Sequence, residues 1–495
     1  MLSEGEYYKL PPFWGLKQYQ KPHFRPKLPP LFGCFGLVLF DKLILHIFCY
    51  IQGLSLVLLT FWAIFNIEHP LSSGDIMVEY QLPLFFISAY LDLTDKDNEL
   101  VRYFKSINIE NIRPVMKTAY SGPGPTGYET SLILSRILKV KQVFISDRVL
   151  TKRLRENATY RILCGFTLNK TPAHTTYHTL RRKLKAEGFA QIHEKFVREA
   201  SNLGLLTPEI PRLPKRMRKG VILVGDSTPI RAYCSSKGER LPDGTWLFTD
   251  PSVAFGKPHH RDKYPVGHKA HSLITVTGIP MVSIVSPRNK SDKDFFPLLE
   301  VYQQRFADIP VAYLVLDRGY DGEEIHRGVY ERYGIIPVII RKKMTYPKGF
   351  KKDGTPLCRY GLPMTKIGID YRRKRTKYAC RKKCQRAKQY FLPCHYLDSE
   401  NDNGLIAYTR FKDSYRKYGP IIPGTVIYKK LRPLGTAIER NYGLVKENRY
   451  RMEYTNTYMG IENVTIHVIE HDMVLTQHIL FDYRQRGKIS PLIKL

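Results

Sequence analysis

The 495-residue sequence predicts an α/β fold. A helical region precedes the α/β domain, and a basic segment interrupts it. From Val221 onward, short apolar segments alternate with segments of helical periodicity, which is typical of a sheet covered by helices. Residues 77–200 have mainly helical periodicity. The chain carries 78 Lys and Arg against 45 Asp and Glu, a formal net charge of +33, and about half of that surplus falls within residues 341–390.

The charge excess indicates a polyanionic partner. A net charge of +33 attracts nucleic acid or an acidic membrane surface, and small-molecule enzymes gain little from it. A hydrophobic content of 43% excludes a wholly disordered or collagen-like chain. Nucleic acid is therefore the first partner to consider, and a reducing cytoplasm, in association with the nucleoid, is the expected location.

Residues 1–76 form a hydrophobic N-terminal segment of uncertain status. Residues 43–66 contain no Asp, Glu, Lys or Arg, and such a stretch is long enough to span a bilayer. It begins too far from the N-terminus, and lacks the small-residue cleavage site, for an ordinary secretory signal. Three interpretations stay open: a membrane anchor, a buried hairpin, and a start site placed too early, with soluble character beginning at Met77. We expect no membrane partner.

Residues 77–210 are expected to form a helical DNA-binding domain. Asp97-Asn98-Glu99 opens one helix, Glu129–Leu138 is a second, and Ser146 is an N-cap for a third over Val149–Arg155. After the turn-rich residues 168–172, a basic helix over Thr175–Lys185 carries Arg181 and Arg182. Helix, turn and basic helix fit a helix-turn-helix motif, and a solvated basic helix is the equal alternative.

Residues 221–340 and 420–480 are expected to form the α/β core. The predicted strands cover Val221–Asp226, Val311–Asp317 and Ile335–Ile340, together with a hairpin of Lys269–Thr277 and Ile279–Ser286 around Gly278. The predicted helices cover Gly322–Tyr333, Leu434–Asn448 and an amphipathic Ile461–Thr476.

Three acids have a context that suggests chemistry. Asp226 and Asp317 each end a predicted strand, and Glu439 lies on a predicted helix. Carboxylates brought together in this way can hold two Mg²⁺ ions for an in-line phosphoryl transfer. Taken singly, each of these acids has a simpler interpretation as the cap of a turn.

The motifs around these acids resemble a known family. VGDST (224–228), HKAH (268–271), LDRGYD (316–321) and IERNYGLVK (438–446) follow a helical basic region in the order seen in DDE transposases of bacterial insertion sequences. The nearest likeness is to the large group with a β-rich insertion before the third acid. LRENATYRILCGF (154–166) and TDPSVAFG (249–256) extend the resemblance to about residues 90–480.

The resemblance implies a ribonuclease-H-like catalytic core with Asp226, Asp317 and Glu439 as the Mg²⁺-binding triad. It also implies cleavage at terminal inverted repeats, transfer of the freed 3′-hydroxyl to target DNA, and a homodimer on DNA. The family signature around the third acid is Tyr, two residues, Arg, three residues, Glu, six residues, Lys. Lys446 matches the Lys and should bind a DNA phosphate, whereas Gly435 and Arg432 occupy the Arg and Tyr positions.

Other polar residues follow the expected strands. Lys269 and His271 share one face of their strand and are expected near the scissile phosphate, or else are an ordinary hairpin Lys and a core His. Asn289 and Asp292 follow the next strand. A competing zinc site would use His259, His260, His268 and His271 with Asp262, but their spacing fits no usual pair of zinc ligands.

Residues 341–419 are expected to form a basic insertion. Residues 341–390 carry 18 Lys and Arg against two Asp and no Glu, and aromatic residues are interleaved with them. Phosphate binding by residues such as Arg373 and Arg375 follows, with aromatics stacking on bases. Cys358, Cys380, Cys384 and Cys394 are either a structural zinc site or free thiols.

Two other functions stay open at this level: a DNA-binding relic of a transposase that has lost catalysis, and a ribonuclease-H-like structure-specific nuclease. A membrane-anchored DNA-binding regulator would need residues 43–66 to span a bilayer.

Overall fold

The structure is a computed structural model that describes residues 98–121, 129–167, 170–207, 220–256, 266–380, 405–423 and 425–488. All of them belong to the larger of two compact units, Val78–Leu495. Residues 1–76, with the apolar segment 43–66, lie outside the described residues, so the interpretations of that segment stay open. Within the described ranges, no helix is long and apolar enough to cross a membrane.

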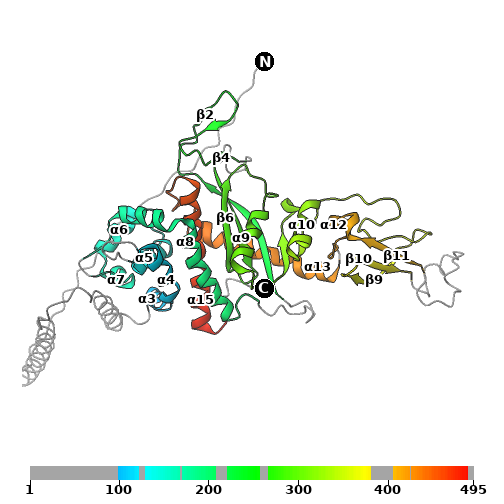
Figure 1. Ribbon diagram of the computed structural model, residues 1–495, viewed down its shortest axis with the longest axis horizontal. Helices are drawn as coiled ribbons and strands as arrows, with labels where there is room; N and C mark the ends of the chain where they lie inside the picture. The colour runs from blue at the N-terminus through cyan, green and yellow to red at the C-terminus, as the bar shows by residue number, and fades with distance from the viewer. Residues whose placement is uncertain are drawn as a thin grey trace, which may run out of the picture. The chain divides into compact units, whose positions relative to one another are not determined.

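A group of helices precedes the first strand (Figure 1). The N-caps at Asn98 and Ser146 are present, and their side chains accept hydrogen bonds from the backbone N–H groups of Leu100 and Val149 at 2.9 and 3.2 Å. The last helix continues beyond the predicted end at Lys185, where a positive φ of 53° marks a kink. The helices are α3 (Glu99–Lys105), α4 (Arg113–Ala119), α5 (Glu129–Lys141), α6 (Asp147–Glu156), α7 (Ala158–Leu163) and α8 (His174–Asn202).

A mixed sheet follows, with the spatial order β6-β5-β1-β7-β8. The pairs β1–β5 and β5–β6 are antiparallel, and the pairs β1–β7 and β7–β8 are parallel. The predicted hairpin is present, and Gly278 has a φ of +82° that side-chain-bearing residues rarely adopt. The strands are β1 (Val221–Arg231), β5 (Val266–Thr275), β6 (Pro280–Pro287), β7 (Val311–Leu316) and β8 (Ile336–Ile339), and β2 (Glu239–Arg240), β3 (Trp246–Leu247) and β4 (Ala254–Phe255) are shorter.

Alternating side chains of β1 enter two different cores. Leu223 belongs to the large core that includes residues of α8, α9 (Phe296–Phe306) and α15 (Ile461–Arg486). Val224 belongs to a second core with Leu431 of α13 (Val426–Leu431) and Ile438 of α14 (Thr436–Tyr442). The sheet is therefore buried on both faces, as expected for parallel strands.

The prediction of an amphipathic closing helix over Ile461–Thr476 is wrong in two respects. Helix α15 extends to Arg486, and its residues from Ile466 to Asp482 are all buried, including polar ones such as Glu470 and His471. The reason is that α15 packs against α5, α8 and β6, so it has no solvated face (Figure 1).

Residues 341–419 contain a second, three-stranded antiparallel sheet of β9 (Thr365–Asp370), β10 (Arg375–Ala379) and β11 (Ile406–Arg410). It is connected to α10 (Glu323–Tyr333) through α12 (Tyr415–Tyr418), and the two helices are in contact. Asp321, just before α10, is fully buried and accepts two hydrogen bonds from Arg416 at 2.7 and 3.0 Å. It also accepts from the backbone N–H of Lys342 at 2.7 Å. Asp321 thereby joins the start and the end of this insertion to the core.

A buried ion-pair cluster connects the helices to α15. The guanidinium of Arg136 on α5, 1% exposed, donates to both carboxylate oxygens of Glu470 at 2.6 and 2.7 Å. It also donates to Tyr458 at 2.7 Å and to Asp147 at the start of α6. Burial and Arg136 together lower the pKa of Lys139 to about 8.

We predict that Arg136→Met destabilises the protein by about 3–5 kcal/mol, because it leaves the carboxylate of Glu470 buried without its partner. Urea or thermal unfolding measures the change. Arg113→Ala is the control, since Arg113 and Glu110 form an exposed pair that should contribute less than about 1 kcal/mol. Equal stability of Arg136→Met and the wild type would contradict the prediction.

Candidate active site

Two carboxylates are adjacent across neighbouring parallel strands. Gly225 of β1 is paired with Leu316 of β7, so the next residues along the two strands are Asp226 and Asp317. Asp317 is exposed directly after β7 ends. Gly225 leaves room for the side chain of Leu316, because a Cβ at this position would lie 2.6 Å from Leu316 Cδ2.

The prediction that the first strand ends at Asp226 is wrong. β1 continues to Arg231, because β5 pairs with it from Leu223 to Arg231 and sets Asp226 opposite Ser272. What stops before Asp226 is the pairing with β7. The backbone of Asp226 is therefore held in the sheet by β5, while on its other side β7 has already ended.

Glu439 comes from helix α14, which covers the face of the sheet that carries Val224 and Asp226. Ala437 and Ile438 are buried in the core that includes Val224, while Glu439 is exposed. Asn441 Nδ2 donates to the carbonyl of Gly278 at 2.9 Å. Tyr442 Oη donates to the carbonyl of Asp226 at 2.9 Å. These contacts fix the helix beside Asp226.

The pKa of Asp226 responds to its burial and to the charges of the other acids. Burial, and to a smaller extent the neighbouring carboxylates of Asp317, Asp292 and Glu439, raise the pKa of Asp226 to about 7, against a hydrogen bond from the Ser227 backbone. Burial and the charge of Asp226 also raise the pKa of Tyr442 well above its usual value. The site thus concentrates negative charge.

Hydrogen bonds from a serine and a lysine lower the pKa of Asp292. Burial opposes this shift, but Asp292 Oδ1 accepts from Ser227 Oγ at 2.6 Å and from Lys269 Nζ at 3.1 Å. Lys269 also donates to the carbonyl of Lys290 at 2.8 Å. Strand alternation places Lys269 and His271 beside Pro229 and Ser227, on the opposite face of the sheet from Asp226.

The other residues predicted around this strand have separate surroundings. His271 Nε2 lies 3.1 Å from Ser286 Oγ, and burial together with Lys269 lowers the pKa of His271 to about 4. Asn289 is exposed. Lys269 and His271 thus share a face, as predicted, but that face is not the one that carries Asp226.

Lys446 lies on the same face as Asp226. Its Nζ is 3.4 Å from the hydroxyl of Thr228, two residues after Asp226 on β1, and 3.1 Å from Glu453 Oε1. Residues 443–448 form a π-helical turn that continues α14 and carries Lys446. Arg432 and Gly435 lie on a short 3₁₀ turn before α14, with Arg432 exposed.

Tyr442 and Ser227 are the site residues that the sequence analysis did not single out. Tyr442 follows Glu439 by three residues, a helical spacing that places both on one face and that was the available signal. Ser227 follows Asp226 on the strand, and no pattern in the sequence indicated its bond to Asp292.

The alternative zinc sites have little support among the described residues. His268 and His271 point to opposite faces of β5, and His268 Nε2 lies 2.9 Å from Ser252 Oγ. His259, His260 and Asp262 lie outside the described residues. Cys384 and Cys394 also lie outside them, so the zinc site of four cysteines, which would include Cys358 and Cys380, stays a prediction. In the described ranges, no three His, Cys, Asp or Glu side chains form a ready-made metal cage.

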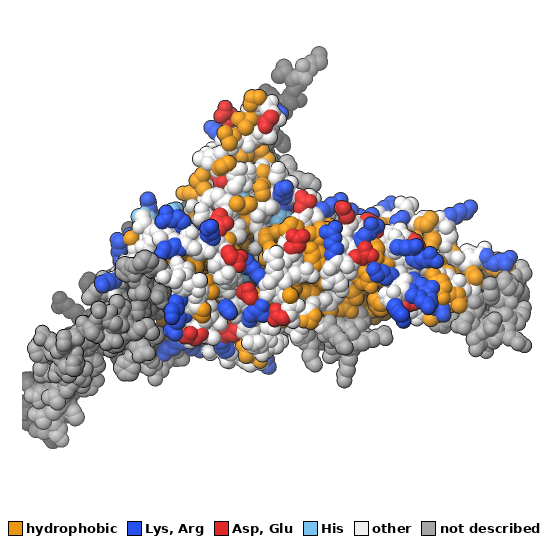
Figure 2. Space-filling view, viewed as in Figure 1, with side chains coloured by type: hydrophobic (Ala, Val, Ile, Leu, Met, Phe, Trp, Pro, Cys, Tyr) orange, Lys and Arg blue, Asp and Glu red, His pale blue; other side chains and the backbone are white. Residues whose placement is uncertain are grey.

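The basic residues predicted to bind DNA differ in their surroundings. Arg181 is paired with Asp147 at 2.6 Å, is stacked over Tyr458 and has only 10% of its side chain exposed, whereas Arg182 is exposed. Arg373 is exposed, and Arg375 stacks over Tyr408 at 4.1 Å. Figure 2 shows Lys and Arg side chains gathered over the part that holds β10 and β11.

We predict that Asp226→Asn stabilises the protein in EDTA at pH 8 by roughly 2–4 kcal/mol, and by much less at pH 5. Since the folded-state pKa of Asp226 is raised to about 7, the unfolded chain releases this proton first, and the wild type loses stability as the pH rises from about 4 to 7. Urea unfolding at both pH values measures this, with the exposed Asp413→Asn as control. A variant less stable than the wild type at pH 8 would disprove it.

Comparison with known families agrees with this geometry. Residues 88–183 match a family described as Transposase domain (DUF772), and residues 218–414 match the Transposase DDE domain, so that together the matches cover more than half of the chain. No curated protein has a significant match to the sequence. The DDE match includes Asp226 and Asp317 and ends before Glu439. It implies a ribonuclease-H-like α/β fold, with which the mixed sheet agrees, and DNA phosphoryl transfer. The chain is therefore a DDE transposase of an insertion sequence.

Proposed function

We propose that Asp226, Asp317 and Glu439 are the catalytic carboxylates with which this transposase cleaves transposon ends and joins them to target DNA. The observation that supports the proposal is that Asp226 and Asp317 each follow the last residue pair of the parallel pairing between β1 and β7, and that the charges of Asp317 and Glu439 both act on Asp226. Residues 221–340 and 420–480 are then the catalytic core.

Transposases of this family use divalent metal ions, typically Mg²⁺. The three acids offer hard oxygen ligands of the kind that Mg²⁺ prefers. In the described ranges they do not form a ready-made metal cage. A bound cation would offset the negative charges that, after burial, raise the pKa of Asp226. Mg²⁺ takes only a few protein carboxylates and completes its shell with water and phosphate oxygens. When bound, the ions supply Lewis-acid assistance to the attacking and leaving oxygens of an in-line phosphoryl transfer.

Tyr442 and Lys446 prepare the site for its substrate. Tyr442 Oη holds the carbonyl of Asp226 and so orients the strand that carries this acid. Lys446, beside Thr228 on the same face, presents a positive charge to a DNA phosphate next to the acids. On the face of the sheet opposite to Asp226, Lys269 forms an ion pair with Asp292. We therefore propose that Lys269 positions Asp292, in place of the predicted DNA contact.

DNA outside the catalytic site is proposed to contact two further regions, residues 77–210 and the basic insertion of residues 341–419. In the insertion, the exposed Arg373 and the neighbouring Arg375 at the start of β10 face phosphates. In the helical region, Arg182 remains a proposed contact, whereas Arg181 is committed to Asp147 and is omitted. We propose that the transposase acts as a homodimer on its paired DNA ends.

We predict that Asp226→Asn and Glu439→Gln each lower Mg²⁺-dependent cleavage of the gene's own flanking DNA by at least about a hundredfold to a thousandfold, because each removes a charge that acts on the reacting phosphate. Binding of the same DNA should persist. Gel analysis of the cut ends, with and without EDTA, measures the effect, and Glu447→Gln on the exposed side of the same helical segment is the matched control.

The outcomes separate the candidate functions. Cuts at two inverted ends followed by joining to target DNA support the transposase assignment for this copy. Bound but uncut DNA indicates a DNA-binding relic, and cuts at DNA junctions without joining indicate a structure-specific nuclease. Full cleavage by Asp226→Asn overturns the assigned site.

We predict that Lys446→Gln reduces the slope of log affinity against log salt concentration by about 1, because it removes one phosphate contact. It should also slow cleavage at saturating protein. Fluorescence anisotropy with end-containing DNA in a salt series measures the slope. The exposed Lys117→Gln on α4 serves as control, and identical slopes for the two variants would remove Lys446 from the binding site.

A further inference from the structure

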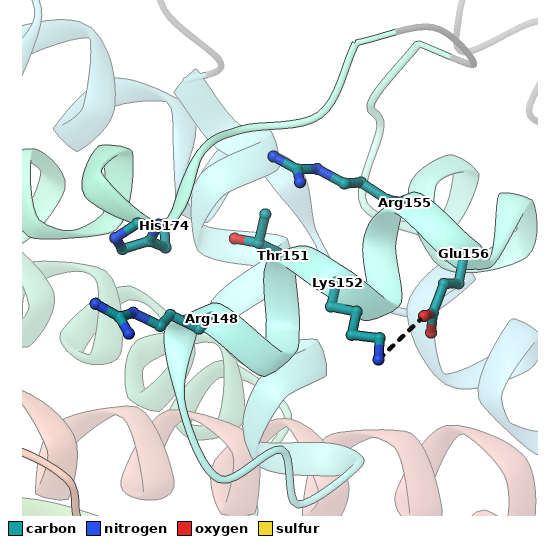
Figure 3. A pocket seen from close by; sticks show the side chains of 6 residues that line it. All are labelled: Arg148, Thr151, Lys152, Arg155, Glu156 and His174. Carbon is teal, nitrogen blue, oxygen red and sulfur yellow. Dashed lines mark ion pairs between the residues drawn. The ribbon is translucent and has the colours of Figure 1, made fainter.

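Helix α6 presents a basic face that borders a pocket. Arg148, Thr151, Lys152 and Arg155 are spaced at i, i+3, i+4 and i+7, which places them on one side of the helix. Together with Glu156 and with His174, the first residue of α8, they line a pocket of about 400 Å³ (Figure 3). The lining carries three cations, one histidine and one carboxylate.

Thr151 has an unpaired hydroxyl at this pocket. Its side chain is buried, with 5% exposed, and Thr151 Oγ1 has no hydrogen-bond partner among the described residues. A buried hydroxyl without a partner is unfavourable and rare, and a helical Thr usually bonds the carbonyl four residues earlier. Figure 3 shows this oxygen turned toward the side of the pocket where His174 and Arg148 lie. The hydroxyl therefore lacks a partner among the described residues, and an oxygen of a ligand in the pocket would supply one.

The cations around Thr151 are weakly committed. Arg148 and Arg155 are exposed, and no side-chain partner is found for either in the part of the chain that the structure describes. Lys152 Nζ lies 3.7 Å from Glu156 Oε1 in an exposed pair, which contributes little. The acid at the start of α6, Asp147, is turned away toward Arg136 and Arg181.

The start of α8 adds to the positive potential. Its N-cap residue is Ala173, which offers no side-chain acceptor to the first backbone N–H groups of the helix. Those groups carry the positive end of the helix dipole. A tetrahedral oxyanion in this pocket would accept hydrogen bonds from the Thr151 hydroxyl and from guanidinium groups at once.

We propose that this pocket binds a phosphate group, and that the phosphate belongs to the backbone of DNA held by the transposase. The second part rests on the proposed function. The inference adds α6 to the DNA contact of the helical region, beside the exposed Arg182 of α8, whose neighbour Arg181 faces inward. Basic side chains lie over α6 in the space-filling view as well (Figure 2).

The test uses the full chain and a short fluorescein-labelled duplex of arbitrary sequence, since phosphate contacts carry no sequence information. Arg155→Gln should weaken binding about threefold to tenfold and lower the salt slope by about 1. Thr151→Val should weaken binding about threefold or more while leaving the midpoint of thermal unfolding unchanged or higher, because it removes the unpaired hydroxyl. Arg153→Gln is the matched control, since Arg153 lies on α6 but outside the pocket.

Inorganic phosphate distinguishes the source of the anion. If phosphate raises the unfolding midpoint of the wild type but not of Thr151→Val, and all variants bind DNA equally, the pocket takes free phosphate and its assignment to DNA is overturned. If Thr151→Val and Arg155→Gln behave as Arg153→Gln with both probes, the pocket binds no phosphate and the proposal fails.

Cleavage of the flanking DNA by the wild type, measured on the same preparation, separates this inference from the proposed function. Mg²⁺-dependent cuts together with unchanged binding by the pocket variants refute the pocket alone. Absence of cuts, with weaker duplex binding by Thr151→Val and Arg155→Gln, refutes the proposed catalysis and supports the pocket.

Discussion

β1 is paired on both sides, parallel to β7 and antiparallel to β5, and these two pairings end at different places. The pairing with β7 stops at Gly225, whereas β5 holds β1 through Arg231. Asp226 is therefore rigid in its backbone but lies beside the end of a strand, where Asp317 emerges. This combination suits the catalytic role proposed for Asp226, because the position of a catalytic acid must be precise while its side chain must reach substrate. The remaining parts of the site take their places relative to this residue.

The third acid depends on a segment far along the chain. Helix α14 packs on the sheet through Ala437 and Ile438, and Tyr442 Oη donates a hydrogen bond to the carbonyl of Asp226. Glu439 on the same helix is thereby close enough to Asp226 for its charge to raise the pKa of that acid. A charged Asp226 opposes folding, because the carboxylate is buried and other carboxylates act on it, and both effects raise its pKa. Strain of this electrostatic kind is typical of functional sites, where it is relieved by the ligand that the site is built to hold.

The positive charge of the chain has two different uses. Arg136, Arg181 and Arg416 are directed toward buried or half-buried carboxylates and hold helices, insertion and core together. Arg148, Arg155 and Arg373 are exposed, and in the proposals above they face DNA. Net charge alone therefore indicates the class of partner but not the residues that touch it. The burial of each side chain and of the carboxylate that it pairs with distinguishes the two groups.

Features that depend on neighbouring residues could be predicted from the sequence: the caps at Asn98 and Ser146, the turn at Gly278, and the apolar strands that lead to Asp226 and Asp317. Each follows from local chemistry, namely capping oxygens, glycine φ or two-residue alternation. Only the tertiary structure decided three features. These are which side chains of β5 lie on the same face of the sheet as Asp226 of β1, whether Arg181 turns inward, and why α15 is buried on every side. These outcomes depend on what packs against the second face of each element, and periodicity in one segment carries no information about its distant partner.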